Sequence, residues 1–213
     1  TMMRTKSLIT IASMMLGTAW ADCVRSCKNT VLVDFEGIAE GTIVDTLTPG
    51  SGIGATSLSG SISISATSNG GFRPGESTTG NAAMIFDSRC PGGCSGGDPD
   101  LLGPGKGYTL FICEDGDTTD PDDAAKGGRI EIDLSGFGPG VFDVCSFVGI
   151  DLELQSGGVK LASFIGAISD TEVTSISGDE FSGVADGEIL TVPVNGANGI
   201  SSVIIETDDS GAY

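Results

Sequence analysis

Residues 129–134 read Arg129-Ile130-Glu131-Ile132-Asp133-Leu134, so that apolar and charged side chains alternate without a break. The run Ser61-Ile62-Ser63-Ile64-Ser65-Ala66 has the same period, with serine in the polar positions. Successive side chains of a β-strand point to opposite faces of the sheet. Both runs therefore predict strands that have one buried face and one solvated face.

The rest of the chain is also typical of strands and turns. Short stretches rich in Val, Ile, Thr and Phe are separated by Gly, Pro, Asn, Asp and Ser, and no convincing helical period is found. Ten strands are predicted: Thr30–Phe35, Ser61–Thr67, Ala82–Asp87, Tyr108–Cys113, Arg129–Leu134, Val141–Leu154, Val159–Ile165, Glu172–Ser177, Glu188–Val192 and Ser201–Thr207. The longest, Val141–Leu154, needs a bend or bulge, which we expect near Gly149. This pattern favours an all-β fold, a two-sheet jelly-roll-like (galactose-binding-like) sandwich.

Composition limits the classes of partner. The 213 residues include 29 acidic and ten basic side chains and no His, for a formal charge of −19. Such a chain is repelled by phosphate backbones, which excludes nucleic acid as a partner and favours divalent cations or basic surfaces. The lack of His removes the commonest general base and transition-metal ligand.

The first residues predict a secretory signal peptide over residues 2–21. Arg4 and Lys6 precede a short apolar run, Leu8–Leu16, and Ala19-Trp20-Ala21 follows with the spacing of a cleavage site. Removal of this segment takes away two basic residues and no acidic one, which leaves a formal charge of −21. The mature chain, 22–213, is expected to be one extracellular or cell-surface domain with no transmembrane segment.

All six cysteines follow the predicted cleavage site. In an oxidising compartment they indicate disulfides, and we favour Cys90–Cys94 around a short loop, Cys113–Cys145 between two strands, and Cys23–Cys27 by elimination. The two Cys-x-x-x-Cys spacings leave half of a zinc cluster as an alternative, without any His to complete it.

Two acidic loops form the most informative part of the chain. Nine acidic residues lie between Asp87 and Asp123, and the strand Tyr108–Cys113 divides them into two loops. Clustered carboxylates repel one another unless a cation neutralises them, and hard oxygen ligands suit Ca²⁺. The candidate metal ligands are Asp98, Asp100, Glu114, Asp122 and Asp123. The alternative is a pair of solvated acidic loops that keep the protein in solution.

Catalytic motifs are largely missing. The sequence has no G-x-S-x-G and no phosphate-binding Gly-rich loop with Lys. A glycosidase needs only two carboxylates, so an Asp/Glu pair remains an option. After removal of Trp20 only Tyr108, Tyr213 and nine Phe are left to stack on sugar rings.

Several motifs resemble one known family. Val33-Asp34-Phe35-Glu36-Gly37 with Glu40-Gly41-Thr42, Ala83–Ser88, Gly97–Leu101 and Asp120–Asp123 are similar to blocks of a poorly characterised secreted β-sandwich domain. That domain occurs in bacterial exported proteins, often ones with sorting signals, and in algal cell-surface proteins. The resemblance implies location and architecture. It also implies a last strand beyond Tyr213, so that 22–213 would be truncated before that strand.

Together these features predict a secreted or cell-surface, non-enzymatic, calcium-stabilised adhesion or matrix module. Its expected partners are extracellular matrix, a cell-surface component or a glycan. The alternative is a secreted carbohydrate-active enzyme that uses an Asp/Glu pair.

Overall fold

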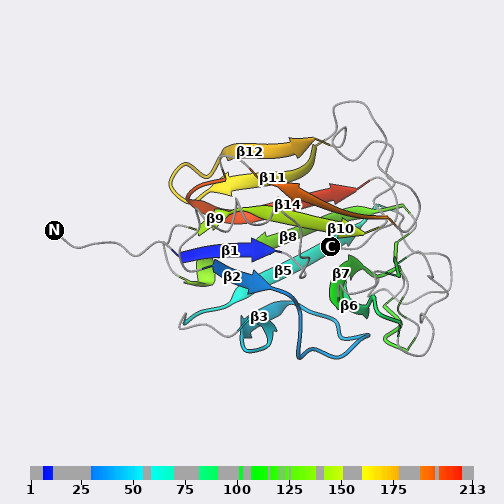
Figure 1. Cartoon of the computed structure of the whole chain (residues 1–213). Coiled ribbons are helices and arrows are strands. Elements are labelled where there is room, and N and C mark those ends of the chain that lie inside the picture. The colour runs from blue at the N-terminus through cyan, green and yellow to red at the C-terminus, as the bar shows by residue number, and fades with distance from the viewer. Residues whose placement is uncertain are drawn as a thin grey trace.

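A computed structural model of the chain is all-β, as predicted (Figure 1). It describes residues 7–11, 30–54, 59–69, 82–90, 101–102, 107–114, 116–119, 121, 123–124, 126–137, 142–150, 160–177, 188–194 and 197–207. Helical conformation within these residues is confined to the 3-10 turn η3 (Ser135–Phe137) and to Leu101. The strands are β1 (Ser7–Ile11), β2 (Thr30–Val33), β3 (Thr46–Pro49), β4 (Gly52–Ile53), β5 (Ile62–Ser68), β6 (Ala83–Asp87), β7 (Tyr108–Ile112), β8 (Gly128–Asp133), β9 (Phe142–Val144), β10 (Ser146–Ile150), β11 (Lys160–Gly166), β12 (Glu172–Ser177), β13 (Ile189–Pro193) and β14 (Ile200–Thr207).

The strands form one large curled sheet and two small ones. The large sheet is mixed and has the order β12-β11-β14-β8-β5-β3-β4-β2-β1-β9. It curls because β9 pairs with β1 on one side and with β14 on the other. The hairpin β6–β7 and the pair β10–β13, whose strands are separated in the chain by β11 and β12, each make a two-stranded antiparallel sheet.

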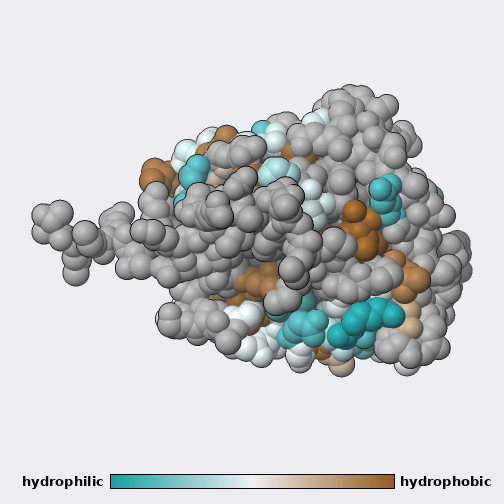
Figure 2. Space-filling model, in the orientation of Figure 1, coloured by the Kyte–Doolittle hydropathy of each residue, from teal (hydrophilic) through white to brown (hydrophobic). Residues whose placement is uncertain are grey.

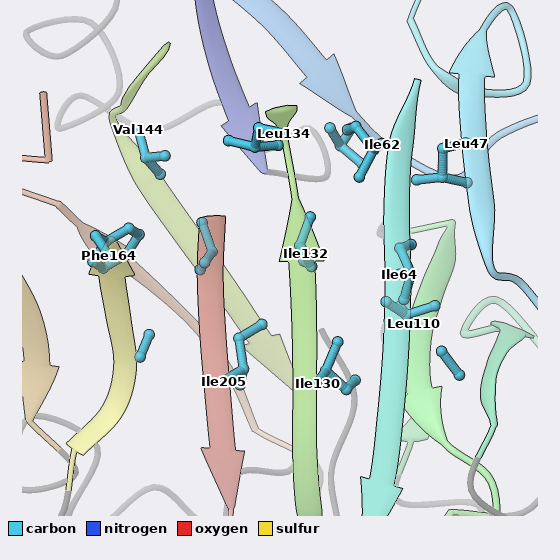
Figure 3. Close-up of a cluster of buried hydrophobic side chains, with 14 of the residues drawn as sticks. Leu47, Ile62, Ile64, Leu110, Ile130, Ile132, Leu134, Val144, Phe164 and Ile205 are labelled. Carbon is cyan, nitrogen blue, oxygen red and sulfur yellow. The ribbon is translucent and has the colours of Figure 1, made fainter. Parts of the chain in front are cut away.

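The two alternating runs form β5 and β8, which are neighbours at the centre of the large sheet. Each was predicted to have one buried face. β8 is antiparallel to β5 on one side and to β14 on the other, and Ile132 pairs with both Ile64 and Val203. The isoleucines of β5 and β8 are buried, while the polar side chains of both strands are partly or fully exposed. Figure 3 shows how the core side chains of these strands meet those of neighbouring strands.

Three details differ from the predicted strands. β3 and β4 were not predicted, because one is short and rich in Thr and the other has only two residues. The long strand over 141–154 breaks at Cys145 and not near Gly149, which lies inside β10. The break lets β9 stay in the large sheet while β10 pairs with β13.

β1 was not predicted either, because it lies inside the segment assigned to a signal peptide. Ser7–Ile11 runs parallel to β2 and to β9 and fills the place between them (Figure 1). This pairing belongs to the uncleaved chain, and the signal peptide stays a prediction.

Few large apolar side chains are exposed among the described residues: Ile43, Leu102, Ile168 and Val173. On the face shown in Figure 2 the described apolar residues form small separate groups among polar ones. In the described part of the chain no helix has the length and apolar character needed to cross a membrane.

Candidate functional site

The β6–β7 hairpin separates two hydrophobic clusters. Ala83, Ile85, Leu110 and Ile112 alternate along its strands and pack into the main core. The intervening positions face away from that core and form an outer cluster of Met84, Phe86, Leu101, Phe111 and Cys113. Leu101 comes from the first acidic loop and is fully buried there. Leu101 therefore lies against the outer face of the hairpin; the rest of this loop, apart from Leu102, is outside the described residues, and a site shared by both acidic loops stays a prediction.

The second acidic loop is closed at its base. Asp123 forms an antiparallel bridge with Cys113, directly after β7, and the backbone N of Ala124 donates to the carbonyl of Ile112 at 2.8 Å. Residues 123–124 thus lie beside the end of β7, held by this isolated bridge. The side chain of Asp123 is buried, and Glu114, at the other end of the loop, is partly buried.

The predicted metal ligands are only partly placed. Glu114 and Asp123 lie at the two ends of the second loop: Asp123 is bridged to Cys113, and Glu114 directly follows Cys113. Asp98, Asp100 and Asp122 fall outside the described residues. Within the residues that are described, no group of three or more Cys, Asp or Glu is arranged to hold a metal ion. The calcium site stays a prediction.

The first acidic loop is also closed at its base. Ser88 donates to the carbonyl of Gly107 twice, from its backbone N at 3.0 Å and from its Oγ at 2.6 Å. Ser88 is fully buried. These bonds extend the β6–β7 ladder by one step and fix the points where the chain leaves and rejoins the sheet.

Arg89 lies next to this base and is held by three side chains. Its Nε donates to Oδ1 of Asp87 at 2.6 Å and its Nη2 to Oδ2 at 2.9 Å, a bidentate pair. The guanidinium carbon lies 4.6 Å from the ring centroid of Tyr108. Its Nη1 is 4.0 Å from Oε1 of Glu36. We call Glu36, Asp87, Arg89 and Tyr108 the arginine clamp.

The clamp shifts the ionisation of its members. The hydrogen bonds from Arg89 lower the pKa of Asp87, although burial of that carboxyl acts in the opposite direction. The same pair raises the pKa of Arg89. The general acid of a glycosidase needs a raised carboxyl pKa. The pKa of Asp87 is lowered instead, so this carboxylate stays ionised and holds Arg89.

Two further contacts tie the clamp to the segment 36–41. The backbone N of Asp87 donates to Oε1 of Glu40 at 3.4 Å, and the backbone N of Gly41 donates to the carbonyl of Ile85 at 2.8 Å. Gly107 has a positive φ of 82°, and a Cβ there would lie 2.5 Å from Oε1 of Glu36. The glycine therefore lets Glu36 approach the base of the first loop.

The sequence did not single out the clamp as a site, because its members are up to 72 positions apart. One signal was available. Arg89 is one of only two basic residues between Asp87 and Asp123. A base among so many acids is a candidate for pairing with a buried carboxylate.

The cysteines agree only partly with the predicted disulfides. Cys90 is disulfide-bonded, and its predicted partner Cys94 lies outside the described residues, as do Cys23 and Cys27. The predicted Cys113–Cys145 disulfide is wrong in this structure, because the two sulfurs are not bonded to each other. Cys113 packs in the outer cluster, where its Sγ accepts a hydrogen bond from the backbone N of Gly116 at 3.1 Å, and Cys145 lies at the break between β9 and β10.

Comparison of the chain with protein-family models, with curated proteins and with solved structures found no match.

Proposed function

We propose that this chain is a secreted or cell-surface, non-enzymatic module in which calcium joins two acidic loops. Its role would be adhesion or matrix assembly, with extracellular matrix, a cell-surface component or a glycan as partner. The secreted β-sandwich family described above, with its two-sheet jelly-roll-like architecture, remains the proposed relative.

The observation that carries the proposal is the position of Leu101. The bases of the two acidic loops lie at opposite ends of β7, about 17 Å apart for five extended residues. Leu101 is buried with Phe111 and Cys113 in the outer cluster. Leu101 therefore brings this point of the chain onto the hairpin, and the residue before it in the sequence is the candidate ligand Asp100.

The electrostatics support a cation. The nine acidic residues between Asp87 and Asp123 face only Arg89 and Lys106 within the same segment. Arg89 is engaged with Asp87 in the clamp, and the segment as a whole keeps a large excess of carboxylates over basic groups. A divalent ion with oxygen ligands would neutralise them.

Calcium binding is tested by thermal unfolding in Ca²⁺, in Mg²⁺ and in NaCl of matched ionic strength. A cation that binds only the folded state adds about 2.7 kcal/mol at a hundredfold excess over Kd, which raises Tm by about 5–10 °C for a domain of this size. Mg²⁺ is expected to do less, because it requires stricter octahedral geometry.

The variant for this test is Asp98→Asn with Asp100→Asn, which should abolish the response to Ca²⁺. The matched control removes two exposed acids elsewhere, Asp45→Asn with Glu206→Gln, and should keep it. Equal shifts from Ca²⁺, Mg²⁺ and NaCl in the unmodified chain would contradict the proposal.

A further inference from the structure

β1 lies between β2 and β9 in the large sheet and occupies the position of a single strand. It pairs with β2 from Leu8↔Thr30 to Ile11↔Val33 and with β9 from Ser7↔Phe142 to Ile9↔Val144, in both cases parallel. Ile11 thus lies at the register position of Val33, and Ile9 at that of Val144. Val33 and Val144 are both buried.

β2, which forms one wall of the gap that β1 occupies, has backbone contacts that do not involve β1. Val33 of β2 pairs with Ile53 of β4, and the backbone N of Gly54 donates to the carbonyl of Leu32 at 2.8 Å. The backbone N of Phe35, just after β2, donates to the carbonyl of Gly52 at 3.1 Å. β2 is therefore fixed to the strand on its far side.

β9, which forms the opposite wall, also has backbone contacts that do not involve β1. Phe142 of β9 pairs with Ile200 of β14, and the backbone N of Val144 donates to the carbonyl of Ala197 at 2.9 Å. The backbone N of Gly199 donates to Oδ1 of Asp143 at 3.1 Å. None of these contacts involves β1, so β2 and β9 each have backbone pairing that does not depend on β1.

We propose that cleavage of the leader opens a strand-acceptor slot between β2 and β9, into which a partner protein inserts an extended segment parallel to β2. The proposal rests on the predicted cleavage after Ala21, which would remove β1 with the leader. Two sheet edges would then present unpaired backbone N–H and C=O groups on both sides of one gap. Addition of a strand to exposed edges is a general mode of peptide recognition.

The register and the charge specify the segment that fits. It carries apolar residues at alternate positions, beside buried Val33 and Val144. It also carries basic residues before these positions, as Arg4 and Lys6 precede β1 in the occupant seen here. Asp143 lies at the slot, at the register position of Leu8, and Asp34 directly follows β2. The cleaved chain also has a formal charge of −21. Both features favour a basic segment.

The experiment uses the full chain with a specific protease site introduced between β1 and Asp22. The chain is folded, cleaved and freed of its leader, and a labelled peptide of residues 5–13 is then added as the probe. We expect the peptide to bind the cleaved chain at least ten times more tightly than the intact chain, where β1 occupies the slot.

Peptide variants test the register. A peptide with Ile9→Asp and Ile11→Asp, at the positions of Val144 and Val33, should lose at least ten times in affinity. The matched peptide with Leu8→Asp and Thr10→Asp places the same charge at the positions of Asp143 and the partly exposed Leu32, and should lose less. Equal losses from both peptides would overturn the proposal.

If the cleaved chain does not stay folded, hydrogen exchange of the backbone amides of the intact chain provides a second test. Amides of β1 should then be protected to the same degree as those of β2. Unprotected β1 amides would overturn the proposal. Failure of the cleaved, folded chain to bind the peptide would also overturn it, and so would closure of the slot by dimer formation. A missing calcium response would leave these results unchanged, so the two proposals fail separately.

Discussion

The guanidinium of Arg89 lies over the ring of Tyr108, 4.6 Å from its centroid, while two of its nitrogens bind the Asp87 carboxylate. Asp87 ends β6 and Tyr108 begins β7, so the contact joins the two ends of the first acidic loop. The clamp therefore fixes the base from which the candidate ligands Asp98 and Asp100 extend.

Replacement of Asp87 by Asn should destabilise the fold at neutral pH. The buried carboxylate accepts three hydrogen bonds from Arg89, and the loss of its charge should cost about 1–3 kcal/mol. Because Arg89 lowers the pKa of Asp87, this stabilisation is present above the unfolded pKa of about 3.9 and is lost as the pH falls through the lower folded value. Urea unfolding at pH 7 and below pH 3 measures the change.

The control for this variant is Glu131→Gln. Glu131 binds Arg129 at 3.0 Å, but both side chains are more than 40 % exposed, so the change should stay within about 0.5 kcal/mol. A deficit of Asp87→Asn that is as large at low pH as at pH 7 would show that lost packing, and not lost charge, is responsible.

Leu101→Ala should be strongly destabilising for a residue in a loop. The side chain is fully buried in the outer cluster, and truncation of a buried Leu costs about 2–5 kcal/mol. Leu102→Ala is the matched control, since Leu102 is 41 % exposed and should change stability by less than about 1 kcal/mol. Similar losses for the two variants would mean that the first loop does not pack on the β6–β7 hairpin.

Gly41→Ala should cost about 3 kcal/mol or more. Gly41 has a φ of 74°, and a Cβ there would lie 2.2 Å from the backbone carbonyl oxygen of Thr118, so strain and a clash add. Gly50 has a similar φ of 85° but nothing within 4 Å of the added Cβ, so Gly50→Ala should cost only about 1 kcal/mol. Thermal unfolding of both variants separates the clash from the strain, and equal values would show that Thr118 moves aside freely.

Cys113 and Cys145 should both react with a thiol reagent after denaturation without reductant. In the folded protein Cys145, which is partly exposed, should react first, because Cys113 is fully buried and requires local opening. Peptide mass spectrometry reads out the two sites. Recovery of a Cys113–Cys145 disulfide peptide would contradict this result and restore the pairing that the sequence suggested.

Strand positions were predictable where the sequence carries a local period. The alternation in 61–66 and 129–134 identified β5 and β8, because burial of one face acts on every second residue. The partners of these strands were not predictable, because pairing such as Ile132 with Val203 depends on residues far apart in the chain. Gly52–Ile53 is too short to show any period.

The candidate site was predictable only by composition. Acid density located the two loops, and it also suggested that the first one folds back. It could not reveal the clamp, since Glu36 meets Arg89 through the fold and not through spacing. Nor could it reveal that Leu101, the residue after Asp100, packs in the outer cluster.

The position of β14 has a mechanical consequence. It pairs antiparallel with β8 from Ser202 to Thr207 and with β11 from Ser202 to Ile205, so both of its edges are bonded along much of its length. A force applied along this strand from its C-terminal end loads both ladders in shear, and many hydrogen bonds must break together. Among the described strands, β12 lies at the end of the order and its ladder is with β11, so that ladder can open one backbone bond at a time. A tether attached after Thr207 would therefore pull on the strand that resists extension best.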